Sequence, residues 1–131
     1  MLFRSIAVAA HEGQTRRDGV TAYIYHPMAV ADRVEHLGYE YVCVAYLHDV
    51  LEDTKFTAHD MLAAGVEDKI VAAVQILTKH PSRSYDEYLR IVKQNELARK
   101  VKIADMLSNL ADSPTDNQIK KYAKGLLFLV Y

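Results

Sequence analysis

The sequence has little of what stabilises or interrupts many other classes of protein. Its single cysteine, Cys43, cannot form an internal disulfide, which excludes a disulfide-stabilised fold and fits a reducing compartment. Five glycines and three prolines leave no flexible linker, and there is no convincing Asn-Gly or Asp-Gly hairpin pattern between alternating strands. These absences argue against a multidomain chain and against a β-rich fold.

Long hydrophobic runs and an excess of one charge are also absent. No stretch approaches the roughly 20 apolar residues of a membrane span. The apolar N-terminal stretch 6–10 ends at His11 and Glu12, so it is shorter than a usual signal-peptide core. A net charge of −1 provides no general attraction to a nucleic-acid polymer or an anionic membrane. We expect a cytoplasmic protein with neither partner, and the sequence leaves the oligomeric state open.

The pattern that remains is helical almost throughout. With 131 residues, half of them hydrophobic, the chain suits one compact domain over 1–131. Apolar residues recur at helical spacing, and Gly13 and Gly38 are suited to end the first two helices. Pro27 suits a first helical position, while Thr57, Ser84 and Ser113 suit N-caps. We predict an all-α, multi-helix domain with helices over 2–12, 27–37, 40–53, 57–65, 67–78, from 85, 97–112 and 114–131.

One face of the predicted helix 40–53 gathers groups that bind metals or move protons. At helical spacing, four such side chains lie within an arc of about 140°: His48, Asp49, Glu52 and Asp53. No lysine or arginine shares that face, and neighbouring acids repel one another by some tenths of a kcal/mol per pair. A divalent cation would remove the repulsion, although a merely solvated charged face remains the alternative.

A second cluster lies in the predicted helix 97–112. Lys102, Asp105, Asn109 and Asp112 share one face, surrounded by apolar residues. Asp105 in such a setting is either paired with Lys102 or bound to a metal, and the pattern alone does not separate the two. His26 precedes Pro27, so its position is fixed by the mouth of a helix.

Taken together, these segments resemble the HD-domain metal-dependent phosphohydrolases, and within them the Rel/Spo-type alarmone hydrolases, including the small stand-alone ones. The matching segments occur in the order of that family, and His-Asp followed by Glu-Asp-Thr is the most specific of them. They are AHEGQTRR at 10–17, YIYHPMAVA at 23–31, LHDVLEDT at 47–54, LTK at 77–79 and KIADMLSNL at 102–110.

The resemblance implies a metal site and a catalytic pair. It implies that four residues bind one divalent metal: His26, His48, Asp49 and Asp105. Two imidazoles and two carboxylates favour manganese, with iron, cobalt or zinc as substitutes. It further implies that Glu52 and Asp53 are the catalytic acidic pair that flanks the attacking water.

The resemblance also implies a nucleotide substrate. Arg16 and Arg17 stand where the family contacts the nucleotide, and Lys102 and Asn109 stand where it contacts phosphate and ribose-phosphate. The expected reaction removes the 3′-diphosphate of guanosine 3′,5′-bis(diphosphate) (ppGpp), or of its pentaphosphate relative, as pyrophosphate and leaves GDP or GTP. Two alternatives stay open. One is an HD phosphohydrolase acting on another nucleotide, such as a 2′- or 3′-phosphorylated one or a nucleoside monophosphate, and the other is a non-catalytic nucleotide-binding module.

Overall fold

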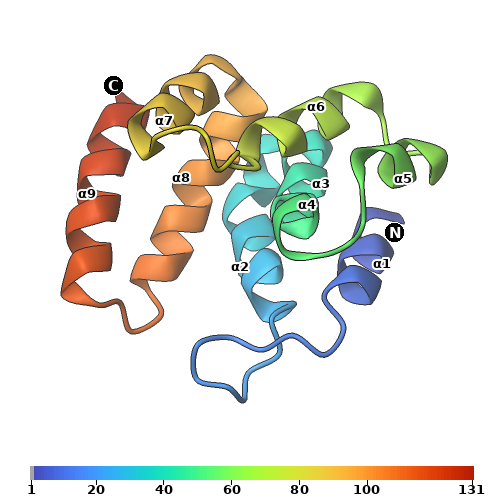
Figure 1. Cartoon of the computed structure of the whole chain (residues 1–131), viewed down its shortest axis with the longest axis horizontal. Coiled ribbons are helices and arrows are strands. Elements are labelled where there is room, and N and C mark those ends of the chain that lie inside the picture. Colours follow the sequence, from blue (N-terminus) through green and yellow to red (C-terminus); the bar gives the residue numbers. More distant parts are fainter. Residues whose placement is uncertain (1) are drawn as a thin grey trace.

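The computed structural model describes residues 2–131, and its secondary structure is helical, with no sheet in that range (Figure 1). The elements in chain order are α1 (Leu2–Ala10), α2 (Tyr25–Val34), the 3-10 helix η1 (Glu35–Leu37), α3 (Tyr39–Leu47), α4 (Val50–Asp53), α5 (Ala58–Ala63), α6 (Asp68–Leu77), α7 (Tyr85–Gln94), α8 (Glu96–Leu110) and α9 (Asp116–Val130). The all-α prediction is confirmed.

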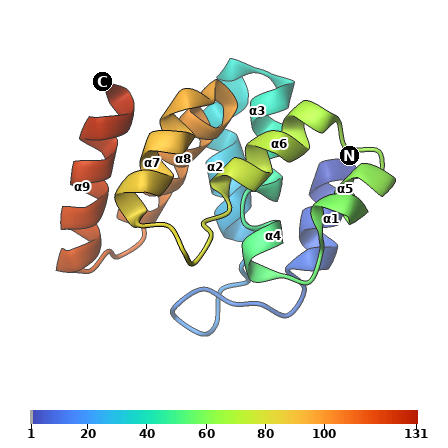
Figure 2. The same cartoon turned by 45° about the horizontal axis from the view of Figure 1, so that its top comes forward.

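Helix α3 forms the centre of the core because it is apolar on nearly every side. Its second half, from Cys43 to Leu47, is buried. It packs against α1, α2, α6 and α8. Helix α9 lies at one end of the molecule, against α7 and α8, and α1 and α5 lie at the other (Figures 1 and 2). The three helices that meet in the middle, α2, α3 and α8, carry the residues of interest.

The predicted helix 40–53 is not continuous. The chain leaves the helix at His48 and Asp49, where Asp49 has φ −106° and ψ −1°, and resumes as the single turn α4. No glycine or proline marks this break in the sequence. Side-chain contacts of His48 and Asp49 with residues outside the helix accompany it, so tertiary structure overrides local propensity here. The prediction of one shared helical face was therefore wrong, although its four residues stay close to one another.

Of the three predicted N-caps, two were right and one was wrong, and the predicted first residue of α2 was also wrong. The side chain of Thr57 caps α5, and that of Ser84 accepts a hydrogen bond from the backbone of Glu87 at α7. Helix α2 begins at Tyr25, two residues earlier than predicted, so Pro27 is its third residue. A proline is tolerated there because the first turn has no intrahelical acceptor for its missing N–H.

The last helix is capped by Thr115 instead of Ser113. Thr115 and Gln118 form a reciprocal capping box, whereas Ser113 lies outside the helix with φ 46°. The sequence from Thr115 to Gln118 fits the Ser/Thr-x-x-Glu/Gln pattern of a capping box, which Ser113 lacks. The helix therefore starts two residues later than predicted.

The connection between α1 and α2 is a short, ordered loop. An isolated antiparallel bridge joins Thr15 and Ala22, and the Asp18 carboxylate accepts hydrogen bonds from the backbone of Val20 and from the backbone and hydroxyl of Thr21. Gly19 has φ +73°, which a residue with a side chain rarely adopts. The tip of the loop is thus a tight turn around Asp18 and Gly19, a feature that the helical pattern did not predict.

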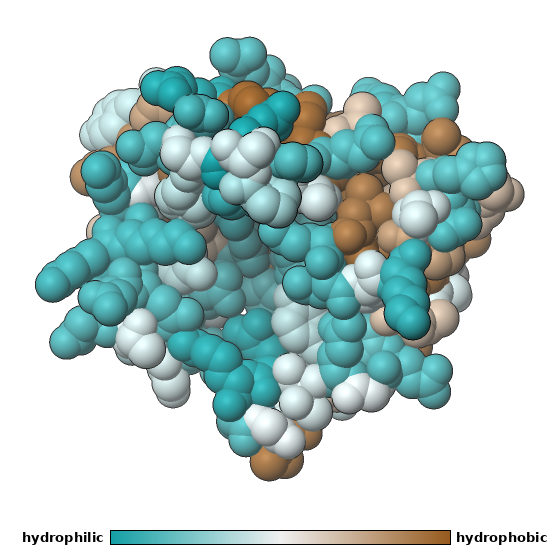
Figure 3. All heavy atoms as spheres, viewed as in Figure 1, coloured by the Kyte–Doolittle hydropathy of each residue, from teal (hydrophilic) through white to brown (hydrophobic). Residues whose placement is uncertain are grey.

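The surface is mostly hydrophilic on the face seen in Figure 3, and this face is hollowed over α2 and α8. Among residues 2–131, no helix is both long enough and apolar enough to cross a membrane.

Candidate metal centre and its surroundings

Three buried side chains from three helices meet at the predicted metal site. His26 on α2, His48 at the end of α3 and Asp105 on α8 each offer one ligand atom, and these atoms lie within 4.8 Å of one another. Asp105 Oδ1 is 2.7 Å from His26 Nε2 and 3.4 Å from His48 Nε2. Adjacent ligands at about 2.1 Å from an octahedral ion lie about 3 Å apart. The spacing therefore suits a shared cation.

The hydrogen bonds of His48 leave its Nε2 atom directed at acidic oxygens. Its Nδ1 atom lies 2.6 Å from the backbone oxygen of Ala45, so Nδ1 carries the proton and donates it there. Nε2 is buried and has no hydrogen-bond partner among the described residues. It nevertheless lies 3.0 Å from Asp49 Oδ2 and 3.4 Å from Asp105 Oδ1. A lone pair facing two carboxylates requires a positive charge between them, and a divalent cation fits this donor set.

Asp49, the fourth predicted ligand, lies on the turn between α3 and α4, beside the group of His26, His48 and Asp105 but not part of it. Its Oδ2 atom accepts a hydrogen bond from the hydroxyl of Tyr23. Burial alone would raise the pKa of Asp49, but the adjacent His48 lowers it to about 2. Burial likewise opposes the charged form of His48, yet Asp49 and Asp105 raise the pKa of His48 well above its usual value. The cluster thus requires one positive charge, which either a proton or a metal ion supplies.

The two oxygens of Asp105 face different partners, so pairing with Lys102 and binding a metal are compatible with each other. Oδ1 faces the imidazoles, while Oδ2 accepts a hydrogen bond from Lys102 Nζ at 3.0 Å. Burial disfavours the charged forms of both residues, but each charge stabilises the other. The pKa of Asp105 is therefore held well below its usual value, and the pKa of Lys102 is held well above its usual value. Asn109 Nδ2 adds a contact to Oδ1 at 3.3 Å. Lys102 therefore orients Asp105 without excluding a metal.

Glu52 and Asp53, the predicted acidic pair, lie on α4 and border two different pockets. Burial, and next the nearby Asp49 carboxylate, raise the pKa of both residues above the usual range. Asp53 borders an open pocket of about 540 Å³ next to Gln14. Glu52 borders another pocket of about 540 Å³, whose remaining lining is basic and aromatic: Lys79, Tyr85, Tyr88, Lys102 and Lys121. With three lysines and one carboxylate, this second pocket suits an anionic ligand.

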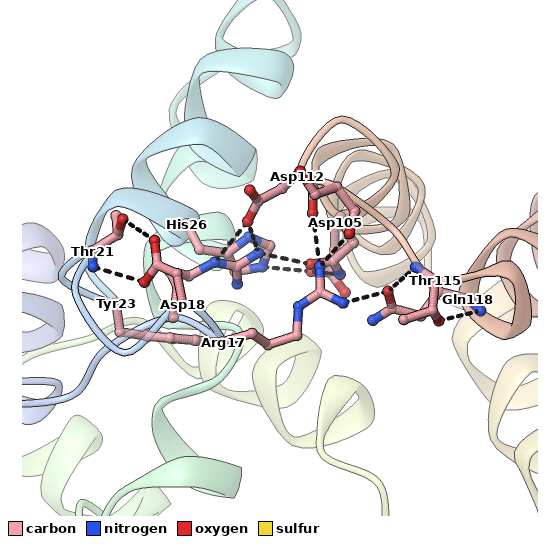
Figure 4. A network of polar contacts seen from close by, with 12 residues as sticks. Arg17, Asp18, Thr21, Tyr23, His26, Asp105, Asp112, Thr115 and Gln118 are labelled. Atoms are coloured by element: carbon pink, nitrogen blue, oxygen red, sulfur yellow. Dashed lines mark hydrogen bonds and ion pairs between the residues drawn. The ribbon is translucent and has the colours of Figure 1, made fainter.

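The two predicted nucleotide-binding arginines are engaged with the junction between α8 and α9. Arg16 donates to the Asp112 carboxylate at 2.8 Å and contacts Asn109 Oδ1 at 3.3 Å. Arg17 donates to Gln118 Oε1 at 2.5 Å and to the backbone oxygen of Asp112 at 2.7 Å. Figure 4 shows Arg17 reaching from the α1–α2 loop to this junction. Both arginines lie near the centre, but neither side chain is free of protein partners.

Three tyrosines near the site were not among the predicted functional residues. Tyr23 contacts Asp49, while Tyr85 and Tyr88 line the lysine-rich pocket. The hydroxyl of Tyr85 is buried without a hydrogen-bond partner within residues 2–131, and Lys121 Nζ lies 4.4 Å from its ring centre. Tyr23 belongs to the motif around His26, which was a usable signal. Tyr85 and Tyr88 carry no such signal, because their role depends on how α7 packs on α8.

No family model matches the chain. Over 87 residues, or 63% of this chain, it is 44% identical to guanosine-3′,5′-bis(diphosphate) 3′-pyrophosphohydrolase of Haemophilus influenzae, of which the match covers 13%. Over 58 residues, or 43% of this chain, it is 52% identical to the bifunctional (p)ppGpp synthase/hydrolase SpoT of Escherichia coli, of which the match covers 8%. The chain thus spans about a tenth of the length of these relatives.

A solved structure is similar over a much larger share of its length. It is described as a metazoan ortholog of SpoT that hydrolyses ppGpp, and it matches with a TM-score of 0.77 at 26% identity. The match covers 97% of this chain and 82% of that one. Sequence and fold therefore agree: the chain is similar in both to Rel/Spo-type (p)ppGpp hydrolases.

Proposed function

We propose that this chain is a single hydrolase domain that removes the 3′-diphosphate of guanosine 3′,5′-bis(diphosphate), or of its pentaphosphate relative, as pyrophosphate. The observation that carries the proposal is the buried cluster of His26, His48 and Asp105, with Asp49 beside it, next to a pocket lined by three lysines. The activities named for the similar proteins support the choice of substrate.

The metal site would be formed by His26, His48, Asp49 and Asp105. Manganese suits two imidazoles and two carboxylates best, and iron, cobalt or zinc are possible substitutes. When bound, the ion would supply Lewis acidity towards phosphate and water. His48 would bind through Nε2, because its Nδ1 proton is held by the backbone oxygen of Ala45.

The acidic pair Glu52 and Asp53 would carry out the proton transfers of the reaction. Glu52 and Asp53 follow the proposed ligand Asp49 within one helical turn, and their raised pKa values bring them closer to the range useful for general acid–base catalysis. Glu52 borders the lysine-rich pocket, so it is placed to exchange a proton with a bound phosphate ester or with the attacking water. Asp53 borders the other pocket, next to Gln14, and would exchange protons there.

The basic side chains would bind the substrate's phosphates and base. Lys79, Lys102 and Lys121 line the pocket beside Glu52 and offer positive charge to a diphosphate. Arg16 lies largely buried at the edge of the centre, where its planar guanidinium can stack on a base. Arg17 and Asn109 complete the predicted contacts, once their present hydrogen bonds to the protein are exchanged for bonds to the nucleotide.

A nucleotide panel tests the proposal against the other reactions open to an HD domain. The purified chain with Mn²⁺ is expected to convert guanosine 3′,5′-bis(diphosphate) to GDP and pyrophosphate in equal amounts. It should leave nucleoside monophosphates and 2′- or 3′-monophosphorylated nucleotides unchanged. A His48→Ala variant serves as the matched control for a contaminating enzyme. Release of orthophosphate from another nucleotide would point to a different phosphohydrolase, and binding without turnover to a non-catalytic module.

A further inference from the structure

Helix α4 is too short to hold its own position. It consists of the four residues Val50–Asp53, and only two backbone hydrogen bonds close it, from Asp53 N to Asp49 O and from Thr54 N to Val50 O. An isolated turn of helix is unstable because its first hydrogen bonds do not offset the loss of backbone freedom. Yet this turn and the residue before it carry Asp49, Glu52 and Asp53. Something outside α4 must therefore fix it.

Two side chains of the α1–α2 connection are attached to α4, one at each end. At its N-terminal end, the hydroxyl of Tyr23 donates to the carboxylate of Asp49. At its C-terminal end, Gln14 Nε2 donates to the backbone oxygen of Asp53 at 2.9 Å. The two bonds flank the turn, so together they restrict both its translation and its rotation about the helix axis.

His11 orients both of these side chains. It is 2% exposed, and its Nδ1 atom lies 2.8 Å from Gln14 Oε1. Because a carbonyl oxygen only accepts, Nδ1 donates, and the amide nitrogen of Gln14 is turned towards Asp53. The His11 ring also packs on the Tyr23 ring with their centres 4.8 Å apart, and the centre of the His26 ring lies 5.8 Å from that of Tyr23. The buried imidazole of His11 thus contacts both residues that are attached to α4, Tyr23 and Gln14.

We propose that Tyr23 and Gln14, both oriented by His11, are positioning residues that brace α4. Tyr23 fixes the orientation of the Asp49 carboxylate for the metal. Gln14 fixes the position of Asp53 and of the turn that bears Glu52. The inference rests on the proposed metal site. The predicted arginine contacts alone do not explain why the loop before α2 is ordered, whereas a role in bracing α4 does. Tyr23 acts through Asp49, and Gln14 through the backbone of Asp53.

Metal affinity tests the Tyr23 half of the brace without relying on turnover. Tyr23→Phe keeps the ring packing on His11 and His26 and removes only the hydroxyl. Loss of a residue that orients a metal ligand weakens metal binding by about 10- to 100-fold. We expect that loss in a Mn²⁺ titration followed by electron paramagnetic resonance, with a melting temperature of the metal-free protein close to that of wild type. Tyr25→Phe, at a tyrosine that is 59% exposed in the same segment, is the matched control and should bind Mn²⁺ like wild type.

Hydrogen exchange tests the Gln14 half. In Gln14→Leu, the amides of Asp53 and Thr54 should exchange about tenfold faster or more, since α4 loses its C-terminal attachment while the rest of the core is kept. The value of kcat should fall with little change in KM. Gln94→Leu, at an exposed position near the end of α7, is the control and should alter neither quantity.

The outcomes separate this inference from the proposed function. If the wild-type chain binds no Mn²⁺, the proposed metal site fails. If wild type binds Mn²⁺ and Tyr23→Phe binds it equally well, the metal site stands and the Tyr23 brace is overturned. Unchanged exchange at Asp53 and Thr54 in Gln14→Leu would overturn the Gln14 brace in the same way.

Discussion

At the scale of single residues, the centre is organised by how its carboxylates are neutralised. Asp105 is shared between two imidazoles and Lys102, whereas Asp49 is shared between His48 and a tyrosine hydroxyl. Within residues 2–131 neither Glu52 nor Asp53 forms an ion pair, and burial raises their pKa values. The first pair is therefore suited to bind a cation, and the second to exchange protons.

Replacing Glu52 with Gln or Asp53 with Asn should separate these two roles. Each change removes a proton-exchanging group without touching a proposed ligand, so kcat should fall by about 100-fold or more while one Mn²⁺ still binds. Steady-state kinetics and metal analysis of the purified variants measure both quantities. A variant that loses the metal, or one that turns over normally, would contradict the assigned roles.

The same Glu52→Gln variant should show a pH-dependent gain in stability when the metal is removed. Burial and the nearby Asp49 raise the pKa of Glu52 in the folded chain above its usual 4.5, so its charged form is disfavoured in the fold. The unfolded chain then ionises first, and wild type loses stability as the pH rises through 4.5 and beyond. Chemical unfolding in a chelator should show Glu52→Gln more stable than wild type at pH 7 and equal to it at pH 3. An equal difference at both pH values would show that the charge is not the cause.

Lys102→Met removes the basic partner of Asp105 and tests how the buried charge is balanced. Lys102 Nζ lies 3.0 Å from Asp105 Oδ2, and both side chains are largely buried. Removing one partner of such a pair destabilises a fold by about 3–5 kcal/mol. Without metal, we expect the variant to lose about 3 kcal/mol of stability. On addition of Mn²⁺, its melting temperature should rise by more than that of wild type. If Mn²⁺ stabilises variant and wild type alike, Asp105 does not need the cation.

At the scale of elements, hydrophobic periodicity predicted the number and order of the main helices because most of them are amphipathic. It failed at His48 and Asp49, where contacts with Tyr23 and Asp105 stop α3 without a local signal. Hydrophobic periodicity also describes each helix separately and gives no information on contacts between distant segments. It therefore did not reveal that Asp53 and Gln14 would meet across the α1–α2 connection.

The N-terminus of α9 gives an element-scale test. Thr115 and Gln118 satisfy each other's backbone N–H groups. Thr115→Ala should destabilise the chain by about 1 kcal/mol. Ser113→Ala should have an effect within about 0.5 kcal/mol, because that residue lies outside the helix. Urea unfolding of the two variants compares them directly, and a larger loss at Ser113 would restore the sequence-based assignment of the cap.

At the scale of the whole molecule, the candidate metal ligands could be proposed from sequence because their residue types and order match a family. Their convergence depends on α2, α3 and α8 packing together, which the apolar faces favour but do not specify. The engagement of Arg16 with Asp112 and of Arg17 with Gln118 could not be foreseen, since these pairs lie in segments far apart in the chain. Lys102 was predicted as a phosphate contact, but the lysine-rich pocket that it lines beside Glu52 was not, because the lining comes from five separate segments.

The central claim is that side chains from α2, from the α3–α4 turn and from α8 bind one cation. Anomalous diffraction at the manganese edge, from crystals grown with Mn²⁺, measures this directly. The account predicts one strong peak at bonding distance from His26 Nε2, His48 Nε2 and the carboxylates of Asp49 and Asp105. A peak elsewhere, or none at this cluster when Mn²⁺ is saturating, would contradict it.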